Sequence, residues 1–176
     1  MDPSRTKNTS MQPPRDPNNS PSQPESLADQ QRLADTVVLI PAAGRVAEGV
    51  MALSNIGCPA MVPVAGRPVI HWKLRYLRSL GLRRFVIAVS RRGMFVEDFV
   101  DCSFGQDCDI SFIVPSSDGG VGRTVLELAE HAQGSSALVV LGDTHFRFAD
   151  PRILLENEPA VLVQAVEDSY RSCIAE

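Results

Sequence analysis

Short runs of β-branched and aliphatic residues alternate with stretches of helical spacing, and this alternation restricts the fold more than any other feature. The runs are apolar at successive positions, which is typical of strands buried on both faces of a sheet. Strands are predicted at Thr36–Ile40, Arg84–Ser90, Asp109–Val114, Ala137–Asp143 and Ala160–Val166. Strands joined by helices form right-handed βαβ units. The sequence therefore predicts an α/β fold, a Rossmann-like three-layer α/β/α arrangement with a mainly parallel sheet.

The clearest helical stretch begins near Pro68 and stops before Gly81. Its apolar stripe consists of Ile70, Leu74, Leu77 and Leu80. We expect Lys73, Arg75 and Arg78 to lie mostly on its other faces. Further helices are predicted at 94–100 and 122–132, and a helical turn at 151–157.

The first 34 residues differ in composition from the rest, since they are rich in Pro, Ser, Asn and Gln and contain few apolar side chains. Such a segment cannot offset the entropy of ordering its backbone. We predict a disordered tail over 1–34 and one domain over 35–176. The mixed charge of the tail argues against a basic partner-binding arm.

The overall composition excludes several classes of protein. A net charge of −4 and a pI of about 5.4 argue against a nucleic-acid partner. No apolar stretch approaches the roughly 18 residues that span a bilayer, and no secretory h-region is present, so we expect a cytoplasmic protein with no membrane partner. The four cysteines and three histidines have no metal-site spacing, and we expect reduced thiols.

The first predicted strand leaves the sheet through the side-chain-poor sequence Pro41-Ala42-Ala43-Gly44. Ligands of parallel sheets bind beyond the carboxyl ends of the strands, so the loops after Pro41, Pro115 and Gly142 are expected at one edge. Small residues in such a loop indicate that a large ligand lies directly against the backbone.

Two common nucleotide loops do not fit this exit. A dinucleotide loop needs Gly-x-Gly-x-x-Gly and an acidic residue about 20 positions later, and the chain has neither. Gly44 and Gly49 have the spacing of a Walker A loop, but Val50 and Met51 replace its Lys and Ser/Thr. From this stretch alone, a plain strand-to-loop turn stays open as an alternative.

Four motifs occur in order along the chain: VVLIPAAGR, CPAMVPVAGRPVI, VPSSDGGVG and VVLGDT. Together they resemble the sugar-1-phosphate nucleotidyltransferases, whose corresponding motifs have the same order and spacing. The resemblance covers the chain from Thr36 to its C-terminus and implies a fold of the nucleotide-diphospho-sugar transferase type. It also implies a nucleoside triphosphate and a sugar 1-phosphate as the small-molecule partners.

The resemblance assigns nucleotide binding to Ala42, Ala43, Gly44, Arg45, Gly119 and Gly122. Gly119 would lie by the base edge, Gly122 would let the next helix begin tightly, and Arg45 would reach the phosphates as one of two catalytic residues. The other is Asp143, an acid at a strand's carboxyl end that would hold Mg²⁺. Glu127, on a predicted helix surface, is expected to be solvated.

The chain also departs from the family pattern. The family's Gly-Thr-Arg after the first glycine is missing, and Ala60 stands where the family has a phosphate-contacting Lys. Arg67 replaces another Lys, which is a milder change. The loss of two cations would weaken charge stabilisation by roughly several kcal/mol in a dry site. A second metal carboxylate has no counterpart before Glu176, so we expect a C-terminally truncated domain.

These observations predict an enzyme that transfers a nucleoside monophosphate from a triphosphate to a sugar 1-phosphate, with release of pyrophosphate, for nucleotide-sugar and polysaccharide synthesis. The departures favour one alternative, a catalytically impaired regulatory module that binds nucleotide or sugar phosphate. A weaker alternative is an assembly protein that uses the tail. The nucleobase, the sugar and the existence of a homo-oligomer stay open.

Overall fold

A four-stranded parallel sheet forms the centre of the protein. The computed structural model describes residues 26–44, 57–91, 94–116, 119–132, 135–148 and 150–156. The strands, in spatial order, are β5 (Asp109–Ile113), β4 (Arg84–Ala88), β1 (Val37–Pro41) and β6 (Ala137–Val139). Four of the five predicted strands are thus confirmed, although β6 ends before Asp143. The fifth, Ala160–Val166, lies outside the described residues.

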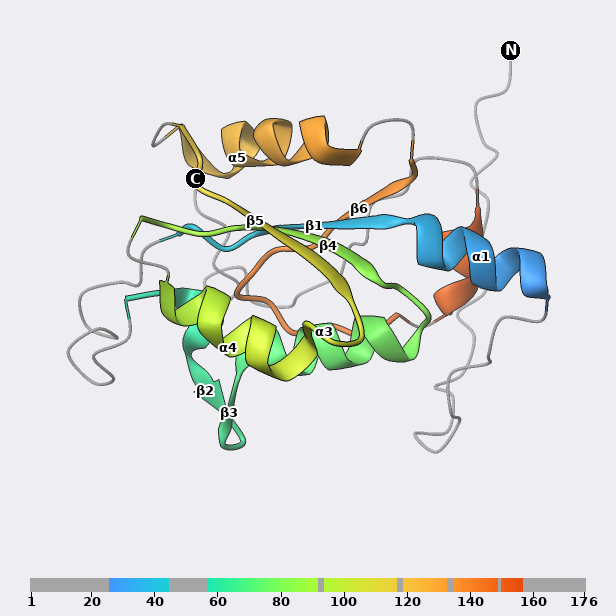
Figure 1. Cartoon of the computed structure of the whole chain (residues 1–176), viewed down its shortest axis with the longest axis horizontal. Coiled ribbons are helices and arrows are strands. Elements are labelled where there is room, and N and C mark those ends of the chain that lie inside the picture. Colours follow the sequence, from blue (N-terminus) through green and yellow to red (C-terminus); the bar gives the residue numbers. More distant parts are fainter. Residues whose placement is uncertain are drawn as a thin grey trace, which may run out of the picture.

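Helices cover both faces of this sheet, which confirms the predicted three layers (Figure 1). Helices α3 (Val69–Ser79) and α4 (Met94–Phe104) lie against one face, and α5 (Gly120–Ala129) lies against the other. Short 3-10 helices occur at η1 (Pro59–Met61), η2 (Glu130–Ala132) and η3 (Pro151–Leu155). Within the described ranges, no helix has the length and apolar character needed to cross a membrane.

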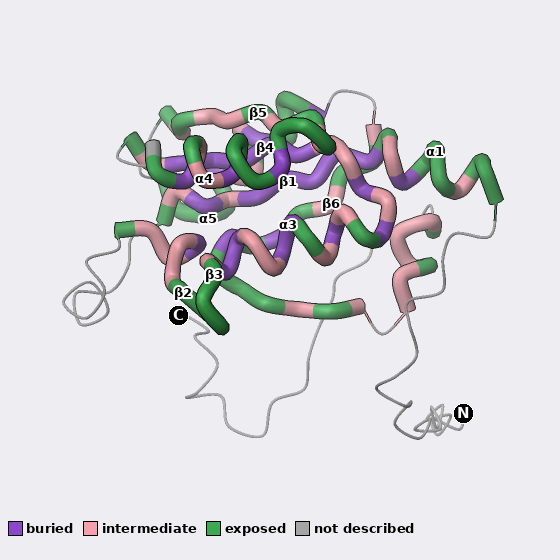
Figure 2. Tube along the Cα trace, turned by 60° about the horizontal axis from the view of Figure 1, so that its bottom comes forward, coloured by how far each residue is buried: buried purple, intermediate pink, exposed green. Residues whose placement is uncertain are grey.

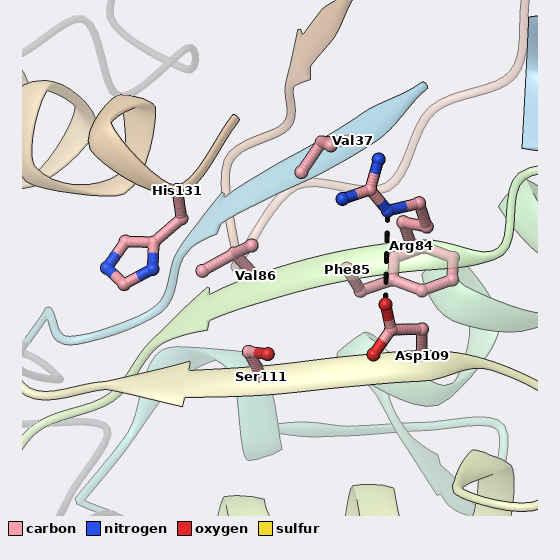
Figure 3. A pocket seen from close by; sticks show the side chains of 7 residues that line it. All are labelled: Val37, Arg84, Phe85, Val86, Asp109, Ser111 and His131. Atoms are coloured by element: carbon pink, nitrogen blue, oxygen red, sulfur yellow. Dashed lines mark ion pairs between the residues drawn. The ribbon is translucent and has the colours of Figure 1, made fainter. Parts of the chain in front are cut away.

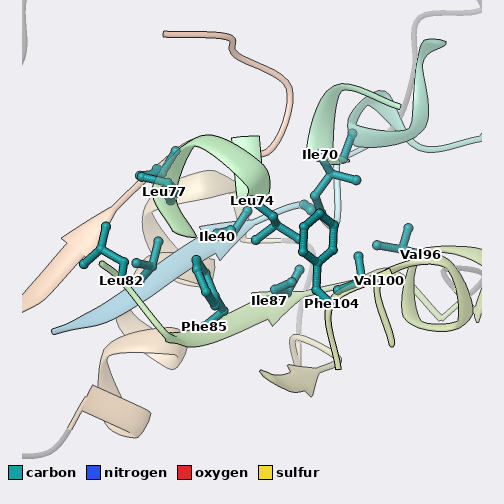
Figure 4. Packing of buried hydrophobic residues seen from close by; sticks show 14 of the residues in the cluster. Ile40, Ile70, Leu74, Leu77, Leu82, Phe85, Ile87, Val96, Val100 and Phe104 are labelled. Atoms are coloured by element: carbon teal, nitrogen blue, oxygen red, sulfur yellow. The ribbon is translucent and has the colours of Figure 1, made fainter. Parts of the chain in front are cut away.

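Successive residues of β1 supply two separate cores, because side chains alternate between the faces of a strand. Val38 and Ile40 join the cluster under α3 and α4, whereas Val37 and Leu39 pack on the α5 side with Leu128. The strand is buried along its length in Figure 2. Figure 4 shows the larger cluster, in which side chains from α3, α4, β1 and β4 meet. Because both faces are buried, polar and apolar residues do not alternate along the sequences of these strands.

The apolar stripe of α3 is confirmed, but the placement of Lys73 away from it is wrong. Lys73 is only 2% exposed, as buried as its apolar neighbours. The reason is helical geometry, since Lys73 follows Ile70 by three positions and precedes Leu77 by four. Its long side chain therefore enters the interface between α3 and the sheet.

Helix α1 (Leu27–Asp35) precedes the first strand, so the predicted tail over 1–34 is wrong for residues 27–34. The Ser26 hydroxyl caps the helix by accepting a hydrogen bond from the Asp29 amide at 3.1 Å. Leu33, at 4% exposure, joins the core beneath α3 and α4. One capping side chain and one buried leucine hold a segment whose average composition is polar. Residues 1–25 lie outside the described ranges.

A small antiparallel hairpin, β2 (Pro63–Val64) and β3 (Arg67–Pro68), leads into α3 and was not predicted. Its turn residues Ala65 and Gly66 both have positive φ angles, of 48° and 76°. The Trp72 indole donates a hydrogen bond to the Val64 carbonyl at 2.8 Å and so ties the hairpin to the first turn of α3.

Candidate functional site

The chain leaves β1 at the carboxyl edge of the sheet through three small residues. Ala42 is buried and donates its amide to the Ala88 carbonyl at 2.9 Å, which continues the pairing of β1 with β4. Ala43 is half-buried and Gly44 is exposed. A β-carbon at Gly44 would meet no atom within 4 Å beyond its chain neighbours. The backbone is therefore open to a ligand at the end of this strand.

The turn after β6 packs directly on this exit. The Gly142 amide donates to the Pro41 carbonyl at 3.2 Å, and a β-carbon at Gly142 would lie 2.9 Å from both the Cα and the Cβ of Ala42. Only glycine permits this approach. Gly142 was predicted only as the place where a loop begins, near the end of the expected strand Ala137–Asp143, and its close packing was not predicted. The contact fixes the exposed Asp143 beside the exit from β1.

Cys58 lies on the other side of Ala42. Its Sγ donates to the Ala42 carbonyl at 3.4 Å. Burial raises the pKa of the Cys58 thiol, and the negative charge of Asp143 acts in the same direction. The thiol therefore stays protonated at neutral pH and serves as a donor at this edge.

Lys73 reaches the same turn from beneath the sheet. Its Nζ donates a hydrogen bond to the carbonyl of Leu141, two residues before Asp143. Burial lowers the pKa of Lys73 to about 8, and the Asp143 carboxylate partly opposes this shift. The ammonium is therefore mainly charged at pH 7. Sequence analysis missed this residue because it treated the lysine as a surface side chain.

The loop after β5 is fixed to α5 by a carboxylate. Glu127 accepts hydrogen bonds from the Ser116 amide at 2.9 Å, the Ser116 hydroxyl at 2.6 Å and the Arg123 Nε at 3.2 Å. The two bonds from Ser116, helped by Arg123, lower the pKa of Glu127. The expectation that Glu127 is simply solvated is wrong, because it holds the loop that leads to α5.

Helix α5 begins at the same edge of the sheet as the exit from β1. Gly119 is its N-cap and has no side-chain capping bond, and Gly120 has a φ of 76°. Gly122, predicted to start the helix, lies within its first turn, and its β-carbon position is open. Because α5 connects parallel strands, it runs back from their carboxyl ends. Its uncapped first amides are therefore available to an acceptor on a ligand.

Of the predicted site residues, Ala42, Ala43, Gly44 and Asp143 lie together around the Gly142 contact. Gly119 and Gly122 lie at the start of α5 on the same edge of the sheet. Arg45, predicted to reach the phosphates, lies outside the described residues. Ala60, where the family pattern has a lysine, is 1% exposed and belongs to the apolar core.

A divalent ion at this edge would depend mainly on Asp143. In the described part of the chain, no group of three or more His, Cys, Asp and Glu side chains is arranged to hold a metal. Magnesium is often bound by one or two carboxylates together with water and substrate phosphates. A single exposed carboxylate beside an open backbone fits that kind of binding, in which the substrate completes the site.

A hollow lies at the opposite, amino edge of the sheet (Figure 3). Its lining residues are Val37, Arg84, Phe85, Val86, Asp109, Ser111 and His131. The Arg84 Nε lies 3.9 Å from the Asp109 carboxylate, and another nitrogen of the Arg84 guanidinium donates to the Ser135 hydroxyl. These contacts hold the Arg84 guanidinium in place between Asp109 and Ser135.

Comparison with known proteins supports the fold alone. No family model matches the chain, and no curated protein gives a significant match. Solved structures of similar fold include HddC from Yersinia pseudotuberculosis complexed with GMP-PN (22% identity, TM-score 0.51). They also include a UDP-glucose pyrophosphorylase complexed with UDP-glucose (22%, 0.50) and a putative glucose-1-phosphate thymidylyltransferase from Bacillus anthracis (18%, 0.53).

The matches cover 61%, 68% and 61% of this chain and 47%, 50% and 44% of those three proteins, in the same order. The chain therefore spans about half the length of the structures it matches. The likeness confirms the predicted fold and the structural resemblance to nucleotidyltransferases.

Proposed function

We propose that the carboxyl edge of the sheet binds a nucleoside triphosphate and transfers its nucleoside monophosphate to a sugar 1-phosphate. The observation that carries this proposal is the contact between Gly142 and Ala42, which places Asp143 beside the small residues at the exit from β1, where a β-carbon at Gly44 would meet no atom within 4 Å. The titles of two structural neighbours, one with GMP-PN and one with UDP-glucose, support ligands of this class. The product would be a nucleotide sugar for polysaccharide synthesis in the cytoplasm.

The exit from β1 would hold the nucleoside. A flat base and ribose can approach main-chain atoms closely only where side chains are small, as at Ala42, Ala43 and Gly44. The first amides of α5, beyond Gly119, would face the base edge, and Glu127 would keep the preceding loop in place. Arg45, directly after Gly44, would lie against the phosphates.

The reaction is a displacement at the α-phosphorus: the sugar phosphate oxygen attacks, the bond to the bridging oxygen breaks, and pyrophosphate leaves. Asp143 would hold Mg²⁺, which when bound neutralises charge on the phosphate oxygens. The protein otherwise acts through positioning and electrostatics, because no covalent intermediate is needed. Lys73 adds a positive charge beneath the turn that carries Asp143.

One observation favours a second candidate, a binding module without turnover. Ala60 is a buried core residue, so the position where related motifs place a phosphate-contacting lysine has no cation. Weaker neutralisation of the leaving pyrophosphate would slow the chemical step more than it would weaken nucleoside binding.

A paired binding and turnover experiment tests the two candidates. ATP, GTP, CTP, UTP and dTTP are titrated into the full chain by calorimetry, with and without Mg²⁺. Pyrophosphate release is then measured with glucose, mannose, galactose and N-acetylglucosamine 1-phosphates. Release that Asp143→Ala abolishes supports the enzyme, and binding without release supports the module. Asp101→Asn, an exposed carboxylate on α4, is the matched control. If the wild type binds no triphosphate, both candidates are wrong.

A further inference from the structure

The carbonyl of Leu141 is the point at which the turn after β6 is held. It accepts one hydrogen bond from the Lys73 ammonium and another from the Thr144 hydroxyl at 3.1 Å. The next residue, Gly142, is fixed to β1 through its amide and its close contact with Ala42. Asp143 follows directly, so these bonds hold the backbone of the turn from which its side chain extends.

Lys73 is an unusual residue for this task. It lies on the buried face of α3 between Ile70 and Leu77, within the largest apolar cluster. A buried ammonium costs free energy unless it is fully bonded or paired. Among the described residues, its ammonium donates to the neutral Leu141 carbonyl, and the carboxylate whose charge acts on it is that of Asp143. An apolar residue would fill this position at lower cost to the fold.

We infer that Lys73 is a positioning residue for the proposed reaction: it fixes the Leu141 carbonyl and thereby directs the Asp143 carboxylate toward the nucleotide. This inference rests on the proposed function. It adds a residue outside the four motifs of the sequence, on the buried face of α3. The cation enters the site from beneath the turn, whereas Ala60 leaves the adjacent position without one.

The test uses Lys73→Met, which keeps the length and apolar stem of the side chain but removes the charge and the donor. Thr144→Val is the matched control, because it removes the other bond to the same carbonyl without removing a charge. Two quantities are measured on the full chain: amide hydrogen exchange at residues 142 and 143, and the dissociation constant of the tightest-binding of the five common triphosphates in Mg²⁺.

In Lys73→Met, exchange at Gly142 and Asp143 should accelerate about tenfold relative to that at Val86 in the core, and the dissociation constant should rise about tenfold. Thr144→Val should give a smaller change in both. In an Asp143→Asn background, Lys73→Met should raise the dissociation constant less than twofold further, since Lys73 acts through Asp143.

Unchanged exchange at residues 142 and 143, or fully additive losses in the double variant, would overturn the positioning role. So would a dissociation constant in Lys73→Met equal to that of the wild type. A wild type that binds no triphosphate would overturn the proposed function itself. The two failures are distinct, because one is seen in the wild type and the other only in the variants.

Discussion

Gly142 packs so tightly on Ala42 that a β-carbon on Gly142 would lie 2.9 Å from the Cα and Cβ of Ala42. This contact joins the ends of β1 and β6, which are far apart in the sequence. It also explains why β6 is followed by glycine, since any other residue would separate the two strand ends.

Gly142→Ala is therefore expected to destabilise the fold by about 1–3 kcal/mol, because the new methyl group meets main-chain atoms that cannot move aside. The free energy of unfolding from urea titration measures this. The control is Gly122→Ala, the same chemical change at a position with open space, which should be neutral or slightly stabilising because alanine favours helices. Equal effects of the two substitutions would contradict the packing argument.

Lys73→Met is expected to stabilise the protein at pH 7 although it impairs the proposed function. Burial lowers the pKa of Lys73 from 10.5 to about 8, a difference worth about 3 kcal/mol against the charged form. The variant also loses the hydrogen bond to the Leu141 carbonyl, which offsets part of this gain. The free energy of unfolding is therefore expected to rise by about 1–2 kcal/mol. A loss of stability would show that the bond outweighs the burial of charge.

The pH dependence of stability tests the same residue. Between pH 8 and 10.5 the unfolded chain keeps the Lys73 proton that the folded chain has lost, so this group makes stability rise with pH. Below pH 8 both states are protonated and the contribution is constant. The stability advantage of Lys73→Met over the wild type should therefore fall by about 2 kcal/mol between pH 8 and 10, which is enough to cancel or reverse it. A constant difference would contradict the lowered pKa.

Glu127→Gln is expected to loosen the loop after β5 without unfolding the protein. The neutral amide cannot replace the charge-assisted bonds to Ser116, so exchange of the Ser116 amide should accelerate about fivefold. Because the folded pKa of Glu127 is lowered, the wild-type bonds should persist below its ordinary value of 4.5 and weaken only at lower pH. Glu130→Gln, an exposed acid on η2, should leave this exchange unchanged.

Helix α1 gives a further test of what belongs to the domain. Leu33→Ala should cost about 2–3 kcal/mol, since it removes a side chain that is 4% exposed. Leu27→Ala, in the same helix, should cost almost nothing because Leu27 is 83% exposed. Thermal or urea unfolding compares the two. If both substitutions change the free energy of unfolding equally little, α1 does not belong to the folded domain.

The sequence predicted best those elements in which all residues are buried alike, as in the central strands. Val38, Ile40 and Ile87 lie in strands that are buried on both faces of the sheet, so the hydrophobicity of the sequence was enough to predict these strands. The carboxyl edge was singled out because ligands of parallel sheets generally bind there. The motifs then located Ala42 and Asp143 at that edge.

The residues that sequence missed owe their roles to contacts between distant elements. Lys73 has the helical position of a core residue, but its charge indicated the surface. Gly142 matters because of Ala42, and Glu127 because of Ser116, and neither partner is a local neighbour. Helix α1 was missed because the prediction used the average composition of 34 residues. That average is polar, although the last part forms a helix with a Ser26 cap and a buried Leu33.

The strand order also has a consequence for synthesis on the ribosome. Strand β1 emerges early, yet one of its two partners, β6, is made last among the strands described. Until residues 137–143 leave the exit tunnel, one border of β1 stays unpaired and the Lys73 ammonium lacks its acceptor. A nascent chain stalled before that point carries the exit from β1 without Gly142 and Asp143, so the carboxyl edge is completed only when this late segment docks.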